Sequence, residues 1–217
     1  MSTLAGLAGT SGSTEGTGST ARFNRPSGLA VDGSGNIYVA DRDNHTLRKV
    51  TAAGVVSTLA GLASTPGFAD GAGSLARFNH PSGVAVDGSG TLYVADTDNH
   101  TLRKVTAAGV VSTLAGLAGS FGSADGAGSA ARFYSPYSAA VDGSSNVYVA
   151  DGFNHTVRKV TAAAVVSTVA GLAGSFGAVP GPLPATLSFG FEAGIGLTPA
   201  GDLIVPSASG LVQITAF

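Results

Sequence analysis

One segment of the sequence, Tyr38–Val50, gathers the residue types that could do chemistry. It places Asp41, Asp43 and His45 within a single short stretch. Carboxylates and imidazoles bind zinc and other divalent cations, so this spacing could hold a metal. The segment returns from Tyr93, and again from Tyr148 with a phenylalanine in place of the second aspartate. The weak metal candidates are Asp41, Asp43, His45, Asp96, Asp98 and His100.

A structural role suits the same residues, and it is the interpretation we favour. Aspartate and asparagine side chains satisfy backbone groups in tight turns. An EF-hand calcium loop would need a glycine and a distal glutamate at fixed offsets, and neither follows Asp41. Separate metal sites, each with one histidine and carboxylates, stay open as an alternative. We therefore expect a turn scaffold that holds no metal and no cofactor.

The elements that position these residues repeat every 55 residues. The sequence STLAG begins at Ser2, Ser57 and Ser112, and STVAG begins at Ser167. Residues 27–63 and 82–118 differ at only four of 37 positions. Such identity indicates a recent duplication or a deliberate construction, and a designed or recently amplified repeat protein without a ligand is one alternative for the whole chain.

Each repeat contains four short stretches with the character of β-strands. SGLAV is followed by the turn signal DGSG, and NIYVAD is followed by RDN. HTLRKVT and VVSTLAG complete the unit, and no stretch keeps a helical period over a useful length. Four antiparallel strands repeated radially predict an all-β fold, the β-propeller.

The count of these units predicts four blades in one domain that spans residues 1–217. The blade cores are expected near 28–61, 83–116, 138–171 and 193–217, with residues 2–6 added to the last blade. The N-terminal strand Ser2–Gly6 would supply the fourth strand that the last blade lacks, which would remove the exposed sheet edges. The alternative is a larger ring closed between two chains, and we expect the monomer.

The ring geometry bears on the metal question. Neighbouring strands lie about 4.8 Å apart, which would put equivalent turns on adjacent blades roughly 14 Å from each other. Ligands of one zinc lie about 2 Å from the metal, so His45, His100 and His155 are too far apart to share one.

The segment PSGVAVDGSGTLYVADTDNHTLRKV resembles the NHL repeat. The resemblance is strong over Gly28–Val50, Gly83–Val105 and Ser138–Val160 and weaker in the last copy. It implies a propeller, usually of six blades in that family, so four blades depart from the pattern. It also implies that Asp, Asn and His belong to the repeat itself. The family's functions include protein scaffolding, RNA binding and, in distant relatives, lyase or hydrolase chemistry.

The composition excludes several classes of protein. A hydrophobic content of 44% predicts a folded core, and a net charge of −2 argues against nucleic-acid and acidic-membrane partners. We expect no signal peptide and no transmembrane segment, because the start lacks a basic region before an apolar one and no apolar run is long enough. The sequence has no cysteine and does not indicate a compartment.

A long Gly/Ser-rich segment precedes the first strand of each unit, and its charges form a pattern. Acidic residues lie seven positions before arginines in three copies, which predicts an ion pair within each segment; the pairs are Glu15–Arg22, Asp70–Arg77 and Asp125–Arg132. The neighbouring phenylalanines are expected to pack between blades; they are Phe23, Phe78 and Phe133.

The long segments and the turns after the second strands should share one face of the ring, and loops on a rigid scaffold commonly carry function. The ligand-face candidates are Arg22, Asn24, Arg42, His45, Arg77, His80, Thr97, His100, Tyr134, Tyr137 and Phe153. We find no nucleophile with a base and no phosphate-binding glycine loop, so no catalytic residue is predicted. The sequence therefore favours a non-enzymatic binding or scaffold propeller for protein or glycan partners. The alternative is a metal-dependent lyase or hydrolase.

Overall fold

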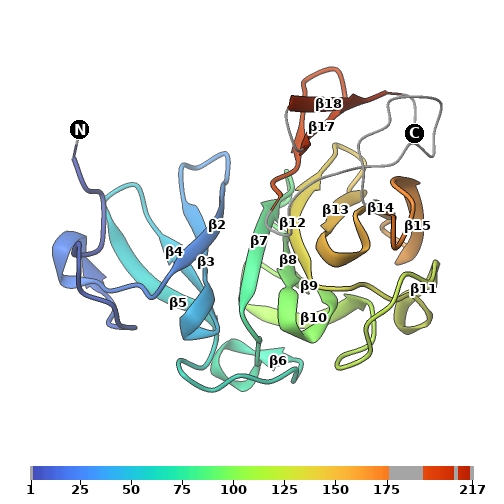
Figure 1. Cartoon of the computed structure of the whole chain (residues 1–217). Coiled ribbons are helices and arrows are strands. Elements are labelled where there is room, and N and C mark those ends of the chain that lie inside the picture. Colours follow the sequence, from blue (N-terminus) through green and yellow to red (C-terminus); the bar gives the residue numbers. More distant parts are fainter. Residues whose placement is uncertain (1, 176–192, 208–209, 216–217) are drawn as a thin grey trace.

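The computed structural model describes residues 2–175, 193–207 and 210–215. These residues form four antiparallel sheets arranged as a four-blade β-propeller (Figure 1), which confirms the predicted all-β class and blade number. The helices in these ranges are 3-10 turns of three residues each. None of them has the length and apolar character that a membrane crossing requires.

The first three blades share one plan, in which a two-residue strand from the long loop joins the outer edge of a four-stranded sheet. The first blade, in the order β1-β5-β4-β3-β2, contains β1 (Gly16–Thr17), β2 (Pro26–Val31), β3 (Ile37–Asp41), β4 (Thr46–Val50) and β5 (Val55–Gly61). The second contains β6 (Gly71–Ala72), β7 (Pro81–Val86), β8 (Leu92–Asp96), β9 (Thr101–Val105) and β10 (Val110–Ala115). The third contains β11 (Gly126–Ala127), β12 (Pro136–Val141), β13 (Val147–Asp151), β14 (Thr156–Val160) and β15 (Val165–Ala170).

The fourth blade has three strands among the described residues; they are β16 (Gly196–Leu197), β17 (Leu203–Ser207) and β18 (Gly210–Ile214). Short 3-10 turns enter the loops of the other blades; they are η1 (Gly18–Thr20), η2 (Arg42–Asn44), η3 (Gly73–Leu75), η4 (Thr97–Asn99), η5 (Gly128–Ala130) and η6 (Gly152–Asn154).

An aspartate fixes the first hairpin in each of the first three blades. Asp32 Oδ1 accepts hydrogen bonds from the backbone N–H groups of Ser34 and Asn36, each at 2.9 Å. The Asn36 side chain also donates to Asp32, and it is the main reason that the pKa of Asp32 is lowered to about 2. Gly35 adopts a φ of 79°, which glycine tolerates best. The sequence DGSG therefore forms a tight turn, as predicted.

The hydrophobic core lies between blades. Tyr38, Ala40 and Leu47 of the first blade belong to one buried cluster with residues of the second blade; these are Phe78, Val84, Leu92, Val94, Val105 and Val111. Equivalent clusters join the second blade to the third and the third to the fourth. Phe78 and Phe133 are completely buried in these interfaces, which confirms that they pack between blades.

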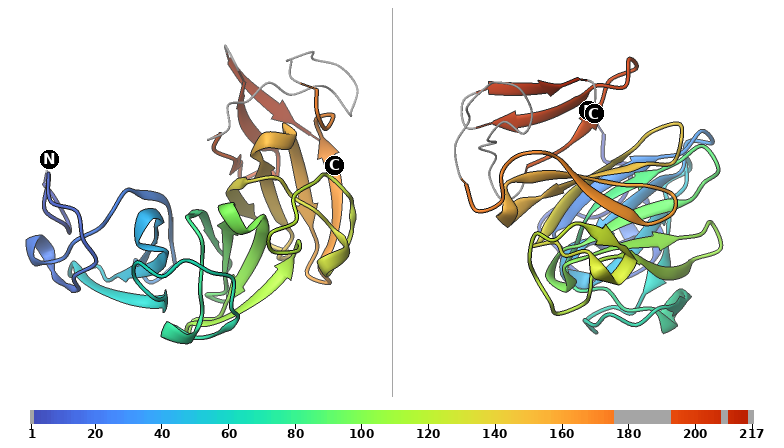
Figure 2. Two further views of the ribbon diagram at one scale, coloured as in Figure 1. Left: turned by 60° about the horizontal axis from the view of Figure 1, so that its bottom comes forward. Right: turned by 90° about the vertical axis from the view of Figure 1, so that its right-hand side faces the viewer.

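The predicted closure of the ring by Ser2–Gly6 is corrected by the structure. The fourth sheet contains only β16, β17 and β18 of the described residues, and Ser2–Gly6 lies against the first blade. Gly6 N donates to Gly18 O at 3.0 Å, just as Gly116 N donates to Gly128 O two repeats further on. These contacts within its own repeat hold the segment at the start of the arc. The four blades consequently form an open arc whose two ends lie apart (Figures 1 and 2).

Candidate binding face

The tripled aspartate is the centre of a buried hydrogen-bond network. Asp41 Oδ1 accepts from the backbone N–H of Asn24 at 2.7 Å, and Oδ2 accepts from Asn44 Nδ2 at 2.7 Å and from Arg48 Nη1 at 2.9 Å. The side chains of Asp41 and Arg48 are both 0% exposed. The carboxylate therefore joins the long loop, the turn and strand β4, which is the scaffold role expected from the sequence.

The second and third blades repeat this network with Asp96 and Asp151. Burial raises the pKa of each to about 6, because desolvation outweighs the nearby arginine and amide donors. Among the described residues, no group of three or more histidine, cysteine, aspartate or glutamate side chains is placed to hold a metal ion. The weak metal candidates are split accordingly, with Asp41 and Asp96 inside and Asp43 and Asp98 at the surface.

The histidine of each motif ends the 3-10 turn, and in the first two copies it links its blade to the next. His45 and His100 both adopt the left-handed conformation with a φ of 59°. His45 Nδ1 accepts a hydrogen bond from the backbone N–H of His80 at 3.1 Å, and His100 Nδ1 accepts one from Ser135 N at 3.2 Å. Each ring therefore positions the loop of the following blade.

Replacing His100 with asparagine should flatten the dependence of stability on pH. Burial lowers the pKa of His100 from 6.5, so the folded state favours the neutral ring. Its contribution is complete above pH 6.5 and is lost as the pH falls through the lowered value. Asparagine tolerates the left-handed backbone and does not titrate. Urea unfolding between pH 7.5 and 5 should show a smaller loss of stability in the variant, whereas parallel profiles would contradict this.

The predicted ion pairs within the long loops are wrong. Asp70 pairs with Arg103 at 2.6 Å and Asp125 with Arg158 at 2.7 Å, so each acid joins the buried arginine of its own blade. Glu15 Oε1 accepts from the backbone N–H of Thr58 at 2.7 Å. The loop arginines donate to backbone carbonyls of their own loops, which satisfies them without an acid; they are Arg22, Arg77 and Arg132.

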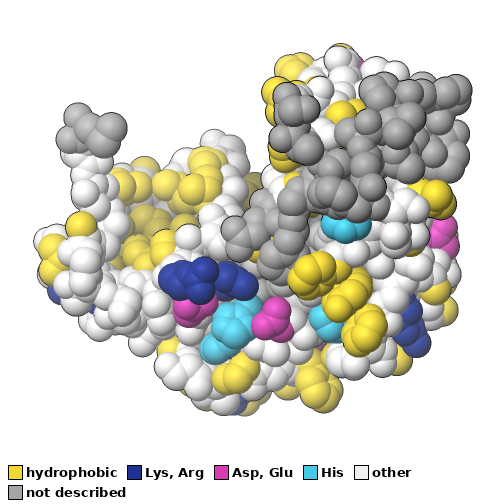
Figure 3. Space-filling view, viewed as in Figure 1, with side chains coloured by type: hydrophobic (Ala, Val, Ile, Leu, Met, Phe, Trp, Pro, Cys, Tyr) yellow, Lys and Arg dark blue, Asp and Glu magenta, His cyan; other side chains and the backbone are white. Residues whose placement is uncertain are grey.

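The long loops and the turns after β3, β8 and β13 share one face, as predicted. Asp43 N donates to Asn24 O, and Phe153 N donates to Tyr134 O, both at 3.1 Å. We call this surface the loop face; it includes Arg25, Asp43, His80, Asp98, Phe121, Tyr134 and Phe153. Figure 3 shows basic, acidic, histidine and hydrophobic side chains gathered side by side on this side of the molecule.

One part of the loop face is polar and lies where the first two blades meet. His80 Nδ1 is 2.7 Å from Asp98 Oδ2, and its Nε2 is 3.9 Å from Asp43 Oδ1. Arg25 adds a positive charge 3.6 Å from Asp43 Oδ2. The His80 ring also meets the His45 ring edge-on, with centroids 4.5 Å apart. One guanidinium and two carboxylates therefore surround His80 in this part.

The adjoining part is aromatic and lies over the third blade. Phe121 stacks on Tyr134 with centroids 4.5 Å apart, and Tyr134 meets Phe153 at 4.8 Å. His100 borders the group, with its centroid 5.7 Å from that of Tyr134. Phe121 is 62% exposed and Phe153 is 46% exposed. We call Phe121, Tyr134 and Phe153 the aromatic cluster.

The remaining candidates are more scattered. Thr97 is completely buried, and its hydroxyl donates to the Pro136 carbonyl at 2.8 Å, so it holds blades together beneath the surface. Arg42 and Tyr137 line a hollow of about 400 Å³ with Arg25. Asn24 contributes its backbone to the Asp41 network.

Phe121 was missed by the sequence analysis, although the repeat carries a signal for it. The position holds Ser11, Pro66 and Phe121 in successive copies. Two further positions change in the same way, from Asn24 and Asn79 to Tyr134 and from Asp43 and Asp98 to Phe153. Comparing the first three copies column by column would have shown that these three positions become aromatic together in the third repeat.

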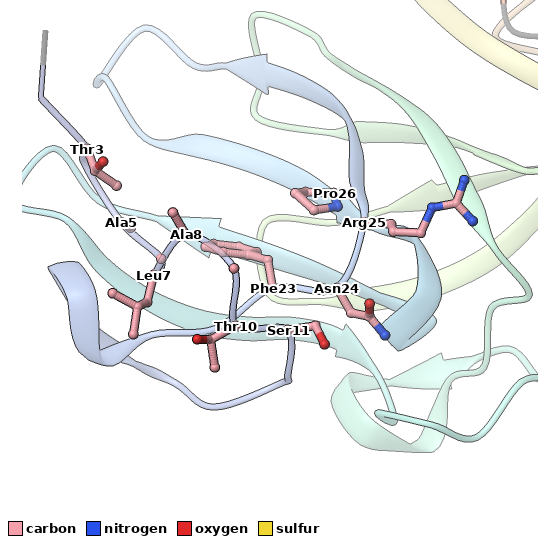
Figure 4. Close-up of a pocket in the computed structure, with 12 residues that line it drawn as sticks. Thr3, Ala5, Leu7, Ala8, Thr10, Ser11, Phe23, Asn24, Arg25 and Pro26 are labelled. Atoms are coloured by element: carbon pink, nitrogen blue, oxygen red, sulfur yellow. The ribbon is translucent and has the colours of Figure 1, made fainter.

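A second hollow, of about 490 Å³, lies on the first blade (Figure 4). Thr3, Ala5 and Leu7 line one side, and Phe23 and Arg25 line the other. Its counterparts on the second and third blades are filled by the preceding blade, as the buried Phe78 and Phe133 show.

Comparison with known proteins gives sequence matches to part of the chain. The family model of the NHL repeat matches residues 23–50 and 78–105. Protein SUPPRESSOR OF QUENCHING 1 of Arabidopsis thaliana is 35% identical over 95 residues, which is 43% of this chain and 9% of that protein. NHL repeat-containing protein 2 of Bos taurus is 38% identical over 94 residues, which is 42% of this chain and 13% of that protein.

Solved structures share the fold at low identity. An auxiliary nutrient binding protein of Bacteroides ovatus has a TM-score of 0.68 and 19% identity, with 94% of this chain and 55% of that chain covered. A gluconolactonase of Xanthomonas campestris has a TM-score of 0.57 and 16% identity, with 94% of this chain and 59% of that chain covered. A chain of a nidogen/laminin complex has a TM-score of 0.58 and 15% identity, with 85% of this chain and 57% of that chain covered. With matches to the NHL repeat in its first two blades and NHL-repeat-containing relatives, the chain is similar to NHL-repeat β-propellers.

Proposed function

We propose that this protein is a non-enzymatic binding propeller that engages a protein partner through the aromatic cluster of its loop face. The observation that carries this proposal is the convergence of Phe121, Tyr134 and Phe153 in space. The first two repeats hold only serine, proline, asparagine or aspartate at these three positions, and the third repeat holds an aromatic residue at all three. They meet on the surface, where large apolar side chains commonly mark an interaction site.

The chemistry of the cluster favours a protein over a sugar. Exposed aromatic groups beside charged and polar side chains resemble the core and rim of a protein interface. Sugars stack on open ring faces, whereas here Tyr134 stacks on Phe121 and also contacts Phe153. The polar part around His80, Asp98 and Asp43 supplies a rim of mixed charge.

An enzymatic role is less well supported by the arrangement of the acids. Asp41, Asp96 and Asp151 are each held by an arginine and an asparagine, so these carboxylates are already committed. Fold neighbours include both an enzyme, the gluconolactonase, and a protein complex, nidogen/laminin, and the fold does not choose between them.

Selection from a phage-displayed library of random peptides would test the proposal. The control variant carries Phe121→Pro, Tyr134→Asn and Phe153→Asp, which are the residues that the second repeat holds at the same positions. The second blade folds with those residues, so the variant should stay folded. We expect peptides that bind the wild type at least tenfold more tightly than the variant.

A glycan array probed with the same two proteins tests the alternative of a glycan partner. Sugar binding that disappears in the variant, without any selected peptide, would contradict a protein partner. Peptides that bind both proteins equally would place binding outside the aromatic cluster and would also contradict the proposal.

A further inference from the structure

The first blade leaves open the face that every following blade buries. Leu29 is 63% exposed, whereas Val84 and Ala139 at the equivalent positions are 6% and 8% exposed. A hollow of about 240 Å³ on this face is lined by apolar residues; they are Leu4, Ala5, Phe23, Pro26, Leu29, Ile37, Val39 and Val50. One repeat further on, six of these eight positions belong to the buried cluster between the first and second blades; they are Ala60, Phe78, Val84, Leu92, Val94 and Val105. The open face is thus shaped to receive a blade.

The fourth blade leaves open the face that, in the other blades, packs on the blade that follows. Leu211 is 76% exposed, while Leu47, Leu102 and Val157 at the same register are completely buried against the next blade. Ile204 and Pro206 stand at the registers of Tyr38 and Ala40, which fill the second blade's hollow. The two ends of the arc therefore carry the two halves of one blade–blade interface.

The free edge of β18 and the segment Ser2–Gly6 are also complementary. In the first blade β4 pairs with β5, and Arg48 faces Thr58. In the fourth blade β18 has no such neighbour among the described residues. Ser2–Gly6 repeats the sequence STLAG of the end of β5. It also takes the corresponding place beside the following blade, because a Cβ on Gly54 would meet Leu4 O as one on Gly109 would meet Leu59 O. Unpaired edges of this kind recruit strands.

We infer that two copies of this chain close head to tail into one ring. In this ring Ser2–Gly6 of each copy adds to β18 of the other, and the open face of each first blade packs on the fourth blade of the other copy. Thr3 would face Val212, as Thr58 faces Arg48 within the first blade. Head-to-tail contacts of this type produce a closed ring when the rotation allows it.

A second copy is the occupant that the observations favour. The contact continues the interface already made three times within the chain, with the same strand register and the same apolar positions. The arc covers 55% of the nutrient-binding neighbour's chain, so one copy corresponds to about half of that protein. This inference departs from the monomer expected from the sequence, because Ser2–Gly6 is held by Gly18 at the far end of the arc from β18.

Sedimentation equilibrium on the full chain tests the assembly. We expect twice the chain mass of 21.1 kDa at micromolar concentration. Leu29→Asp should shift the protein to the single-chain mass, because it places a charge in the contact. Leu75→Asp is the matched control, since Leu75 is 70% exposed on a loop away from both open faces, and it should leave the mass unchanged. A wild-type monomer at all concentrations, or an open-ended series of larger species, would overturn the inference.

Cysteine cross-linking tests the strand pairing, and the chain offers a clean background because it has no cysteine. Thr3→Cys protein is mixed with Val212→Cys protein under mild oxidation. Facing positions on antiparallel strands suit a disulfide, so we expect a covalent dimer of the two proteins. Ser89→Cys, in an exposed turn, replaces Val212→Cys as the control and should give none. No dimer from the first mixture, or equal amounts from both, would contradict the pairing.

Discussion

Replacing Arg103 with methionine should lower the free energy of unfolding by about 3–5 kcal/mol, the usual cost of removing one partner from a buried ion pair. Arg103 is 1% exposed and donates to Asp96 and Asp70, at 2.7 and 2.6 Å, and to the Arg77 carbonyl at 3.0 Å. Without it the Asp96 carboxylate would be left buried with only amide donors. Urea unfolding measures the loss directly.

The loss should depend on pH in a definite direction. Burial raises the pKa of Asp96 to about 6 in the wild type, and Arg103 opposes that rise, so the variant's pKa must be higher still. A carboxyl whose folded-state pKa is raised costs stability as the pH rises through that value. The deficit should therefore be larger at pH 8 than at pH 5. Arg77→Met serves as the control, because Arg77 donates only to nearby loop carbonyls, and a comparable loss there would contradict this account.

Replacing Gly83 with alanine should cost about 2–3 kcal/mol, the upper part of the range for overpacking. An added Cβ would lie 2.6 Å from Ser138 Cα, 2.7 Å from Tyr137 O and 2.9 Å from Ala139 N. All three atoms are backbone of the adjacent strand β12, so no side chain can swing away and the second and third blades must separate. The midpoint of urea unfolding should fall accordingly.

Gly88→Ala is the matched control for this prediction. Gly88 lies in the turn after the same strand, has no positive φ, and has no atom within 4 Å of an added Cβ. The control should leave stability unchanged or slightly raised, since alanine restricts the unfolded chain more than glycine does. Equal effects of the two substitutions would show that close blade packing at Gly83 is not the cause.

The repeat made the architecture predictable. Strand boundaries, the DGSG turn at Asp32, the blade number and the burial of Phe78 and Phe133 all follow from local pattern and from the 55-residue period. The scaffold role of Asp41 was also predictable, because aspartate beside asparagine in a turn commonly caps backbone groups.

Contacts between residues that lie far apart in the sequence were not predictable in this way. Asp70 is seven residues from Arg77 but pairs with Arg103, which a buried strand brings to it from 33 residues away. Gly83 and Ser138 occupy the same position in successive repeats, yet only glycine fits the spacing between the second and third blades. Ring closure failed as a prediction because contacts with Gly18 and Gly54 hold Ser2–Gly6 on the first blade.

The aromatic cluster shows what near-identical repeats add to such reasoning. Where two copies differ at few positions, those positions report what one blade does and another does not. The three changes at Phe121, Tyr134 and Phe153 are far apart in sequence and meet only in the fold. This pattern is what makes the function testable by exchanging residues between blades.

Calorimetric titration of a selected peptide into a transplanted variant tests the central claim most directly. The variant carries Pro66→Phe, Asn79→Tyr and Asp98→Phe, which would build a second aromatic cluster on the second blade. If the cluster is the binding site, the stoichiometry should rise from one peptide per chain in the wild type to two in the variant. A folded variant that still binds one peptide per chain would contradict the account.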